Sequence, residues 1–180
     1  LNSSIIFGFD FFSNSNISFE PTLNLATPSN YQLGPGDSLT INIWGAAENT
    51  YDKTIGPDGA IRVESVGPIF LSGLSIDQAR NKIRTSLGRI YSGINAAKDS
   101  PYKIYTDISL NNIRRVQVNI IGEVKAPGTY SLSALSTLLN ALYAAGGPTE
   151  NGTFRNVKLV RNGRQISNFD IYKFYFIYYI

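Results

Sequence analysis

The stretch YQLGPGDSLTINIW, residues 31–44, places two glycines, a proline and an aspartate directly before an alternating run. A glycine loop that binds nucleotide phosphates follows a strand and opens a helix, and its dinucleotide form needs a third glycine. Here the loop precedes a strand and no third glycine follows. We therefore interpret the loop as structural, with glycines that permit positive φ, a proline that fixes the turn and an aspartate that accepts backbone N–H groups: Gly34, Pro35, Gly36 and Asp37.

The composition excludes several kinds of active site. The chain has no cysteine, no histidine and no methionine, so it lacks thiolate nucleophiles, imidazole bases and the usual zinc ligands. No calcium loop of the D-x-[DN]-x-[DN]-G pattern occurs either, and we expect no metal and no cofactor. Because no methionine begins the chain, we expect a processed or excised piece, with any signal peptide or lipid anchor upstream of it.

The charge is unevenly spread along the chain. Residues 1–112 carry 8 Lys and Arg against 10 Asp and Glu, whereas residues 113–180 carry 8 against 3. This change of sign predicts a domain boundary near residue 112. The basic second half either meets an anionic partner or forms an ordinary solvated face, and the second case is the commoner. No basic run exceeds Arg114-Arg115, so nucleic acid is not an expected partner.

Residues 31–112 read as one unit of strands with a helix. Alternating apolar residues predict strands at residues 37–44, 50–55, 60–63, 66–71 and 102–110. The second and third of these strands are predicted to pair as a hairpin through the turn GPDG. The helix begins at Ser75, which can form a capping box with Gln78. Apolar residues then follow at helical spacing, at Ile76, Ala79, Ile83 and Leu87.

Residues 113–175 read as a second, smaller unit. Strands are predicted at 114–121, after the turn Pro127-Gly128, and in two runs joined by Asn162-Gly163. A helix is predicted over 134–145, ended by Gly146 and Gly147. Its apolar stripe is Leu135, Leu138, Leu139 and Leu142. The β-β-α-β-β order suits a small sheet around one helix, as in a β-grasp fold, so the fold class is α+β.

The two ends of the chain fit neither unit. Residues 1–30 have no Lys or Arg and read as an extended arm, whose aromatics dock on the domain that follows or on a neighbouring subunit. These aromatics are Phe7, Phe9, Phe11, Phe12 and Phe19. Residues 176–180 close the aromatic run FYFIYYI and read as a truncated C-terminal end or an interface.

A search for catalytic groups finds only weak candidates. The carboxylates that could form a hydrolytic pair are Asp52, Asp58, Glu64 and Glu123, although a solvated turn residue is the commoner reading of Glu123. Ser100 and Lys103 match S-x-x-K, but a strand follows rather than the helical turn that this chemistry needs. Trp44 either stacks on a sugar ring or anchors the core, and a core anchor is more common. Arg114 and Arg115 are the other candidate glycan contacts.

The turns and glycines, taken in order, resemble the bacterial outer-membrane polysaccharide export proteins. The first unit resembles their export domain through YxLGPGDxL at residues 31–39, IWG at 43–45 and PDGxI at 57–61. VGP at 66–68 and SGLS at 72–75 continue the series. The second unit resembles their SLBB (soluble-ligand-binding β-grasp) domain. It does so through VxIxGEV at 118–124, PGxY at 127–130 and AAGG at 144–147, which include Gly122, Pro127, Gly128, Gly146 and Gly147. The arm is similar to the segment before the export domain in long members from Bacteroidota.

The resemblance implies a fold, a function and partners. It implies a mixed-sheet export domain over residues 31–112 and an SLBB domain over 113–175. It also implies that the chain is the periplasmic part of a channel that passes capsular polysaccharide or exopolysaccharide through the outer membrane without catalysis. The expected partners are further copies in a ring, an inner-membrane co-polymerase and the polysaccharide, with outer-membrane anchoring through parts outside these 180 residues. A periplasmic glycan-binding module without a channel role is the alternative.

Overall fold

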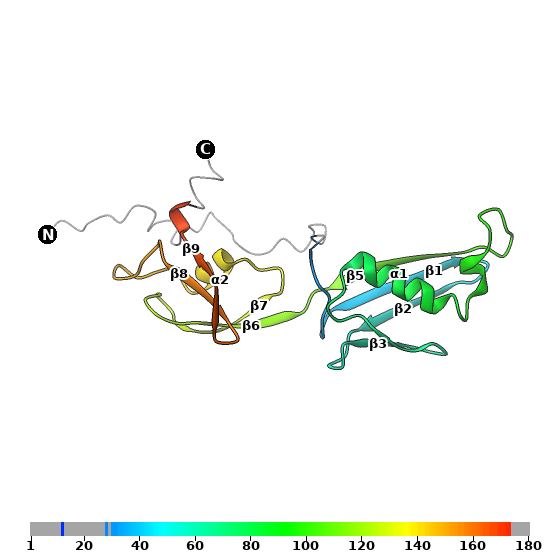
Figure 1. Ribbon diagram of the computed structural model, residues 1–180, viewed down its shortest axis with the longest axis horizontal. Coiled ribbons are helices and arrows are strands. Elements are labelled where there is room, and N and C mark those ends of the chain that lie inside the picture. Colours follow the sequence, from blue (N-terminus) through cyan, green and yellow to red (C-terminus); the bar gives the residue numbers. More distant parts are fainter. Residues whose placement is uncertain (1–11, 13–27, 29, 174–180) are drawn as a thin grey trace. The chain divides into compact units, whose positions relative to one another are not determined.

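A computed structural model describes Phe12, Pro28 and residues 30–173, which form two compact units. Of the described residues, one unit holds Pro28 and residues 30–115, and the other holds Phe12 and residues 116–173. Small antiparallel sheets and few helices make the fold α+β, which confirms the predicted class (Figure 1). The predicted segments Phe7–Phe11 and 176–180, as well as Phe19, lie outside the described residues.

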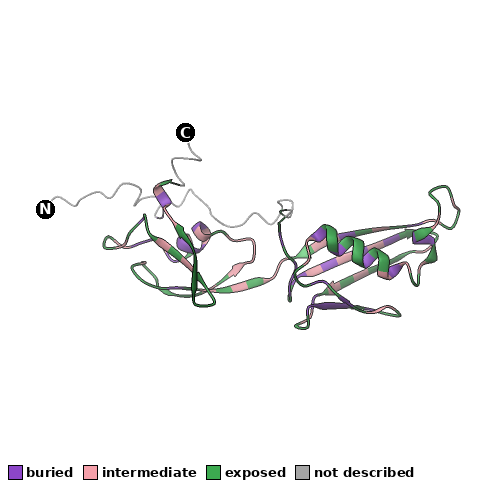
Figure 2. Cartoon of the chain, viewed as in Figure 1, coloured by how far each residue is buried: buried purple, intermediate pink, exposed green. Residues whose placement is uncertain are grey.

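The first unit is built on a three-stranded antiparallel sheet in the order β2-β1-β5. Its strands are β1 (Ser38–Gly45), β2 (Asn49–Thr54) and β5 (Ile104–Asn112). Along β1 every second residue is buried, which confirms the predicted alternation (Figure 2). The last strand begins later than expected, because a turn from Ser100 to Lys103 occupies the residues before it.

One face of this sheet is covered by α1 (Ile76–Leu87). The capping box between Ser75 and Gln78 is present, as predicted, and the four expected apolar residues of the helix are all buried. Leu39, Ile41 and Ile43 of β1 are buried as well, so the helix and the strand both contribute apolar side chains that are removed from water. The 3-10 helix η2 (Ser92–Asn95) then leads back toward β5.

The predicted hairpin between residues 50–55 and 60–63 was wrong. β3 (Ala60–Val63) pairs with β4 (Gly67–Phe70), while β2 pairs with β1. The GPDG segment closes on itself instead, because the Gly56 N–H donates to the Ala60 carbonyl and Gly59 adopts a φ of 79°. The hairpin turn comes one strand later, where Ser65 has a φ of 63° and Gly67 a φ of 89°.

The second unit follows the predicted β-β-α-β-β order, with β6 (Arg115–Ile120) paired to β7 (Gly128–Ser133) and β8 (Val157–Arg161) paired to β9 (Arg164–Phe169). Its helix α2 spans only Leu138–Ala144, so the prediction of a start at residue 134 was wrong. Ser133 and Ser136 form a turn there, and Thr137 caps the helix through a capping box with Asn140. The helix ends before the glycine pair as expected, and Gly146 has a φ of 76°, but the C-cap is Ala145 and not the glycine that we predicted.

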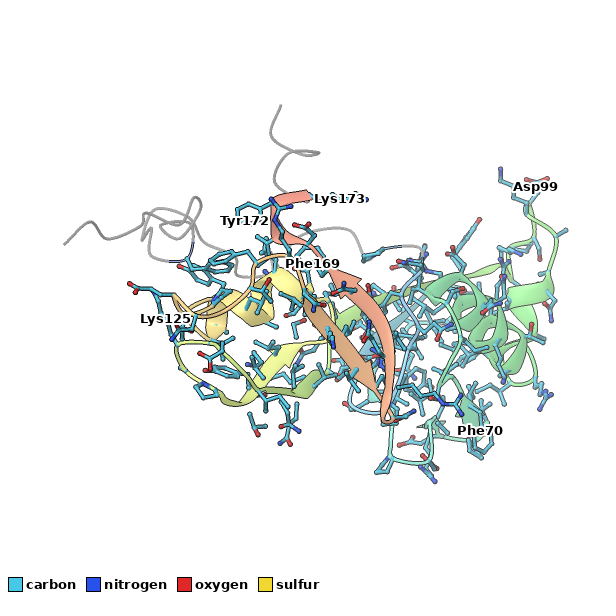
Figure 3. The ribbon with its side chains drawn as sticks, turned by 60° about the vertical axis from the view of Figure 1, so that its left-hand side comes forward. Phe70, Asp99, Lys125, Phe169, Tyr172 and Lys173 are labelled. Atoms are coloured by element: carbon cyan, nitrogen blue, oxygen red, sulfur yellow. The ribbon has the colours of Figure 1, made fainter. Side chains whose placement is uncertain are left out.

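The core of the second unit includes a residue from the start of the chain. Phe12 is buried in a cluster with Leu139, Leu142, Phe154 and Ile171. Phe169 and Tyr172, whose side chains are marked in Figure 3, pack against this cluster. A Cβ built on Gly147 would collide with the Phe12 ring, so this position accommodates no larger residue while the ring is in place. The one described aromatic of the arm therefore docks on the second unit.

Candidate functional site

The glycine loop of residues 34–37 is organised around a buried carboxylate. Asp37 has no exposed surface, and its two oxygens accept four hydrogen bonds. The Tyr31 hydroxyl donates at 2.7 Å and the Gly34 N–H at 2.9 Å. Arg114 donates twice, through its backbone N–H at 2.8 Å and its Nη1 at 2.7 Å. A carboxylate with this many donors is a fixed structural element.

The same contacts place the Arg114 side chain. Its Nη1 also donates to the Tyr31 hydroxyl and to the Gln32 carbonyl, and the guanidinium lies over the Tyr31 ring at 5.5 Å. A Cβ on Gly34 would lie 3.0 Å from the guanidinium carbon, which explains why a small residue is found there. Burial, followed by the hydrogen bond to Asp37, raises the pKa of Tyr31. The Arg114 side chain is 27% exposed and is committed to this network.

The two other candidate glycan contacts lie elsewhere. Arg115 opens β6 and is exposed. Trp44, near the end of β1, is 45% exposed, so it does not anchor the core as the commoner interpretation would have it. It stacks on Tyr105 of β5, with ring centroids 5.8 Å apart and planes at 20°. Tyr105 is itself 40% exposed, and the two residues are cross-strand partners.

Trp44 and Tyr105 belong to the side of the sheet that α1 does not cover. We call this side the open face, because each of its residues is exposed or only half-buried. The strand registers assign eleven residues to it, namely Ser38, Thr40, Asn42, Trp44, Thr50, Asp52, Thr54, Tyr105, Asp107, Ser109 and Asn112. Apart from the two aromatics, all are hydroxyl, amide or carboxylate side chains.

Polar residues of the open face are linked across the strands. The Thr40 hydroxyl donates to Asp52 at 2.6 Å, and Ser38 and Thr54 share a hydrogen bond of 2.8 Å. Thr50 donates to Asn42 at 3.2 Å. These bonds hold the side chains in a regular array of donors and acceptors, next to a flat aromatic surface. Chemically, such a surface can stack on a sugar ring and hydrogen-bond to its hydroxyl groups.

The four candidate carboxylates are dispersed over both units. Asp52 is on the open face, and Asp58 pairs with exposed Arg62 at 2.7 Å. The hydrogen bond from Arg62 lowers the pKa of Asp58, opposite to what a general acid needs. Glu64 lies in the β3–β4 turn, and Glu123 accepts a hydrogen bond from Thr149. Within the residues described, no three His, Cys, Asp or Glu side chains cluster as a metal site would require.

The S-x-x-K pair has no reactive geometry. The Ser100 hydroxyl accepts from the Tyr102 N–H, while the Lys103 ammonium donates to the carbonyls of Ile94 and Ala96. The lysine is thus occupied away from the serine and is not its base. None of the helices in the part of the chain described here is long and apolar enough to cross a membrane.

The glycines expected in the second unit hold its turns. Gly122 has a φ of 97°, a conformation that favours glycine. Gly147 accepts a backbone hydrogen bond from Lys125, which joins the loop containing Pro127 to the end of α2. Gly128 begins β7.

Two family descriptions match the chain, one for each unit. Residues 25–97 match the family described as polysaccharide biosynthesis/export protein, and residues 117–169 match the SLBB domain. Among curated relatives, the polysialic acid transport protein KpsD of Escherichia coli is 31% identical over 145 residues, which cover 80% of this chain and 24% of the relative. The chain thus combines a polysaccharide biosynthesis/export domain with an SLBB domain.

Other relatives of this chain carry related names. The EPS I polysaccharide export outer membrane protein EpsA of Ralstonia nicotianae is 28% identical over 178 residues, covering 85% of this chain and 44% of the relative. The exopolysaccharide production protein ExoF of Rhizobium meliloti is 26% identical over 134 residues, covering 69% and 30%. The chain therefore spans less than half the length of these relatives. Their names denote export and production proteins rather than hydrolases.

Sequence reasoning missed Tyr105 as the partner of Trp44. The signal that could have found it is strand register, since both aromatics fall on the polar side of alternating strands. The sequence alone does not show that residues 38–45 pair with residues 104–112, because the two segments are far apart in the chain. The sequence also gave no sign that Arg114 is held by Asp37.

Proposed function

We propose that this chain belongs to a polysaccharide export protein and forms the periplasmic part of an outer-membrane channel for capsular polysaccharide or exopolysaccharide. The observation that carries the proposal is the order of the two family matches, an export domain followed by an SLBB domain, along most of the chain. The relatives named for polysialic acid transport and for EPS I export support it. Because those names refer to different polymers, the family alone does not define the sugar.

The proposed mechanism is passage without chemistry. A polymer that must leave as readily as it enters needs weak contacts distributed over a surface, since a tight site would stall it. The open face has this character, with hydroxyl, amide and carboxylate groups spread over three strands. The dispersed carboxylates and the occupied Lys103 also favour transport over hydrolysis.

The proposal includes partners that a channel requires. Copies of the full-length protein form a ring through the export and SLBB domains, and an inner-membrane co-polymerase delivers the polymer to it. The complex is periplasmic and associated with the outer membrane, through parts of the protein beyond these residues. Arg115 and Trp44 remain the candidate glycan contacts. Arg114 instead supports the glycine loop of residues 34–37 through its bonds to Asp37.

The test is deletion of the full-length gene, followed by separate assays of surface and periplasmic polysaccharide. Loss of surface polymer, with polymer retained in the periplasm or its synthesis shut down, is the expected result. Restoration by the intact gene controls for effects on neighbouring genes. Unchanged surface polymer, in a strain without a second homologue, would contradict export and favour a glycan-binding module without a channel role.

A further inference from the structure

We propose that the open face of the β2-β1-β5 sheet is a glycan-binding surface that accepts neutral sugar residues and repels carboxylated ones. The Trp44–Tyr105 pair forms its stacking platform, and the polar side chains of the three strands form its hydrogen-bonding track. This inference rests on the proposed function, because the ligand is taken to be the exported polymer. Beyond the proposed function, it identifies the protein surface that contacts the polymer and whether the bound sugars are neutral or charged.

The first step of the argument concerns the aromatic pair. Tryptophan is highly buried on average and tyrosine is intermediate, because burial of either ring removes a large apolar area from water. Here both rings remain 40–45% exposed while stacked on each other. They lie on neighbouring strands, as cross-strand partners, and the rigid sheet holds them. The apolar C–H face of a pyranose would bury the ring surface that now faces water.

The second step concerns the rest of the face. The aromatic pair continues into Asn42 and Asp107, which are paired across the same two strands, and then into Thr40 and Ser109. No Leu, Ile, Val or Phe is among the eleven residues that the registers place there. A protein partner would normally be met by an apolar centre with a polar rim. A surface with aromatics at one end and short polar side chains elsewhere fits a hydroxyl-rich chain better.

The third step is charge. The open face carries the carboxylates of Asp52 and Asp107 and none of the cationic side chains of the sheet. The lysine of β2, Lys53, pairs with Leu39 and so lies on the helix-covered side, and its ammonium lies 5.7 Å from the Tyr51 ring. Lys103 donates to two backbone carbonyls before β5 begins. A uronic or sialic acid unit on this face would meet like charge without a compensating cation.

The test uses the 180-residue chain and polymer purified from the surface of the source bacterium. The polymer is cleaved to oligosaccharides, which anion exchange separates into neutral and carboxylated fractions. Trp44 is the single tryptophan of the chain, so its fluorescence reports directly on the platform. Amide NMR then maps which residues respond.

We expect the neutral fraction to change Trp44 fluorescence and to shift amide signals along β1 and β5. Tyr105→Ala, which keeps the reporter, should weaken this binding about five- to tenfold, as expected for loss of a stacked ring. Phe70→Ala is the matched control, because Phe70 is 55% exposed on β4 and outside the open face. Equal binding of Tyr105→Ala and the parent chain would overturn the platform.

The charge rule has its own variants. Asp52→Asn with Asp107→Asn should raise affinity for the carboxylated fraction several-fold and leave the neutral fraction unchanged within about twofold. Asp77→Asn with Glu64→Gln removes the same number of charges from α1 and the β3–β4 turn, and should change neither. Preferential binding of the carboxylated fraction by the parent chain, or a polymer without a neutral fraction, would overturn the assignment.

A complementation experiment separates failure of this inference from failure of the proposed function. The full-length gene carrying Trp44→Ala and Tyr105→Ala is placed in the deletion strain, with protein abundance and oligomeric state measured beside surface polymer. We expect several-fold less surface polymer at normal abundance and assembly. If deletion abolishes export but the double variant exports normally, the inference fails and the function stands. If the double variant loses its assembly instead, the open face is an interface between copies and the inference also fails.

Discussion

At the scale of single residues, Asp37 links the glycine loop to the last residues of the first unit. Its partner Arg114 comes after β5, the last strand of the sheet. The ion pair therefore joins the segment before β1 to the segment after β5. A carboxylate without exposed surface is stable only while its donors are in place, because burial of an uncompensated charge is costly. The loop that opens the domain therefore owes its conformation to a residue 77 positions away.

Asp37→Asn should destabilise the first unit by about 3 kcal/mol, the cost of removing one partner from a buried ion pair. The amide would keep the shape of the carboxylate but turn a donor toward Gly34 or Arg114, both of which already donate. Urea unfolding followed by Trp44 fluorescence measures the change, since the single tryptophan reports on this unit.

The control is Asp58→Asn, which removes the exposed ion pair with Arg62. Exposed pairs contribute little, so this change should leave the free energy of unfolding nearly unchanged. Equal costs for the two variants would show that the Asp37 network does not hold the unit together.

The residue-scale prediction from sequence was partial for a physical reason. Short-range turn chemistry makes Asp37 a backbone acceptor, and it does accept from Gly34. The bond to Arg114 depends on how far β5 runs before the chain turns, which local sequence does not encode. For the same reason, local sequence placed Trp44 on a strand but did not identify Tyr105 as the ring that it stacks on.

At the scale of elements, the sequence patterns predicted which helices and strands form. They did not predict where each element begins and ends or which strands pair. The helix of the first unit was predicted well, because capping box and apolar spacing agree. Residues 134–137 continue the leucine spacing of α2 yet are not helical, since the Leu135 N–H is taken by the Ser133 hydroxyl. Likewise, the GPDG segment predicts a turn, but it does not predict whether the strands on either side of the turn pair with each other.

Thr137→Ala should destabilise the second unit by about 1 kcal/mol, as expected for loss of an N-cap. The effect follows from the seven-residue length of α2, which makes each terminal hydrogen bond a large share of the helix. Urea unfolding followed by circular dichroism and by NMR signals of Leu139 and Leu142 measures it. Thr137→Ser, which keeps the hydroxyl, should restore most of the stability; an alanine variant as stable as the parent would contradict the cap.

A pH dependence follows from the contact between β2 and the segment after α1. The hydroxyls of Tyr51 and Tyr91 share a hydrogen bond of 3.0 Å. This bond, followed by burial, raises the pKa of Tyr51 from 10.0 to about 12. The folded state thus favours the neutral phenol. Its contribution to stability is fully present below pH 10.0 and is lost as the pH rises from there through about 12.

Tyr91→Phe should move the pKa of Tyr51 back toward 10.0 by removing its main cause. Ultraviolet titration of tyrosinate measures this, with Tyr51→Phe used as the difference control among the 11 tyrosines. A Tyr51 titration that Tyr91→Phe leaves unchanged would show that the hydrogen bond does not set this pKa.

At the scale of the whole molecule, the second unit is completed by the beginning of the chain. Phe12 is buried with residues that lie more than a hundred positions later. Phe12→Ala should destabilise the second unit by about 3 kcal/mol, the usual cost of removing a buried phenyl ring. NMR signals of α2 during urea unfolding measure the change, and Phe70→Ala, at an exposed site of the other unit, is the control. An unaffected second unit would mean that Phe12 does not contribute to its core.

The proposed channel makes the last prediction, because a channel requires several copies. Full-length protein extracted from membranes in mild detergent should migrate as one large homo-oligomer. Cysteine pairs introduced into the exposed surfaces of the export domain and of the SLBB domain should both cross-link neighbouring copies. These 180 residues contain no cysteine, and the full-length protein without introduced cysteines serves as the blank for cross-links that arise elsewhere. Cysteines at buried Leu39 and Leu139 serve as controls that should not react. A ring in contact through both domains gives cross-links in both, whereas a strictly monomeric extract would contradict the channel and leave a glycan-binding module as the better account.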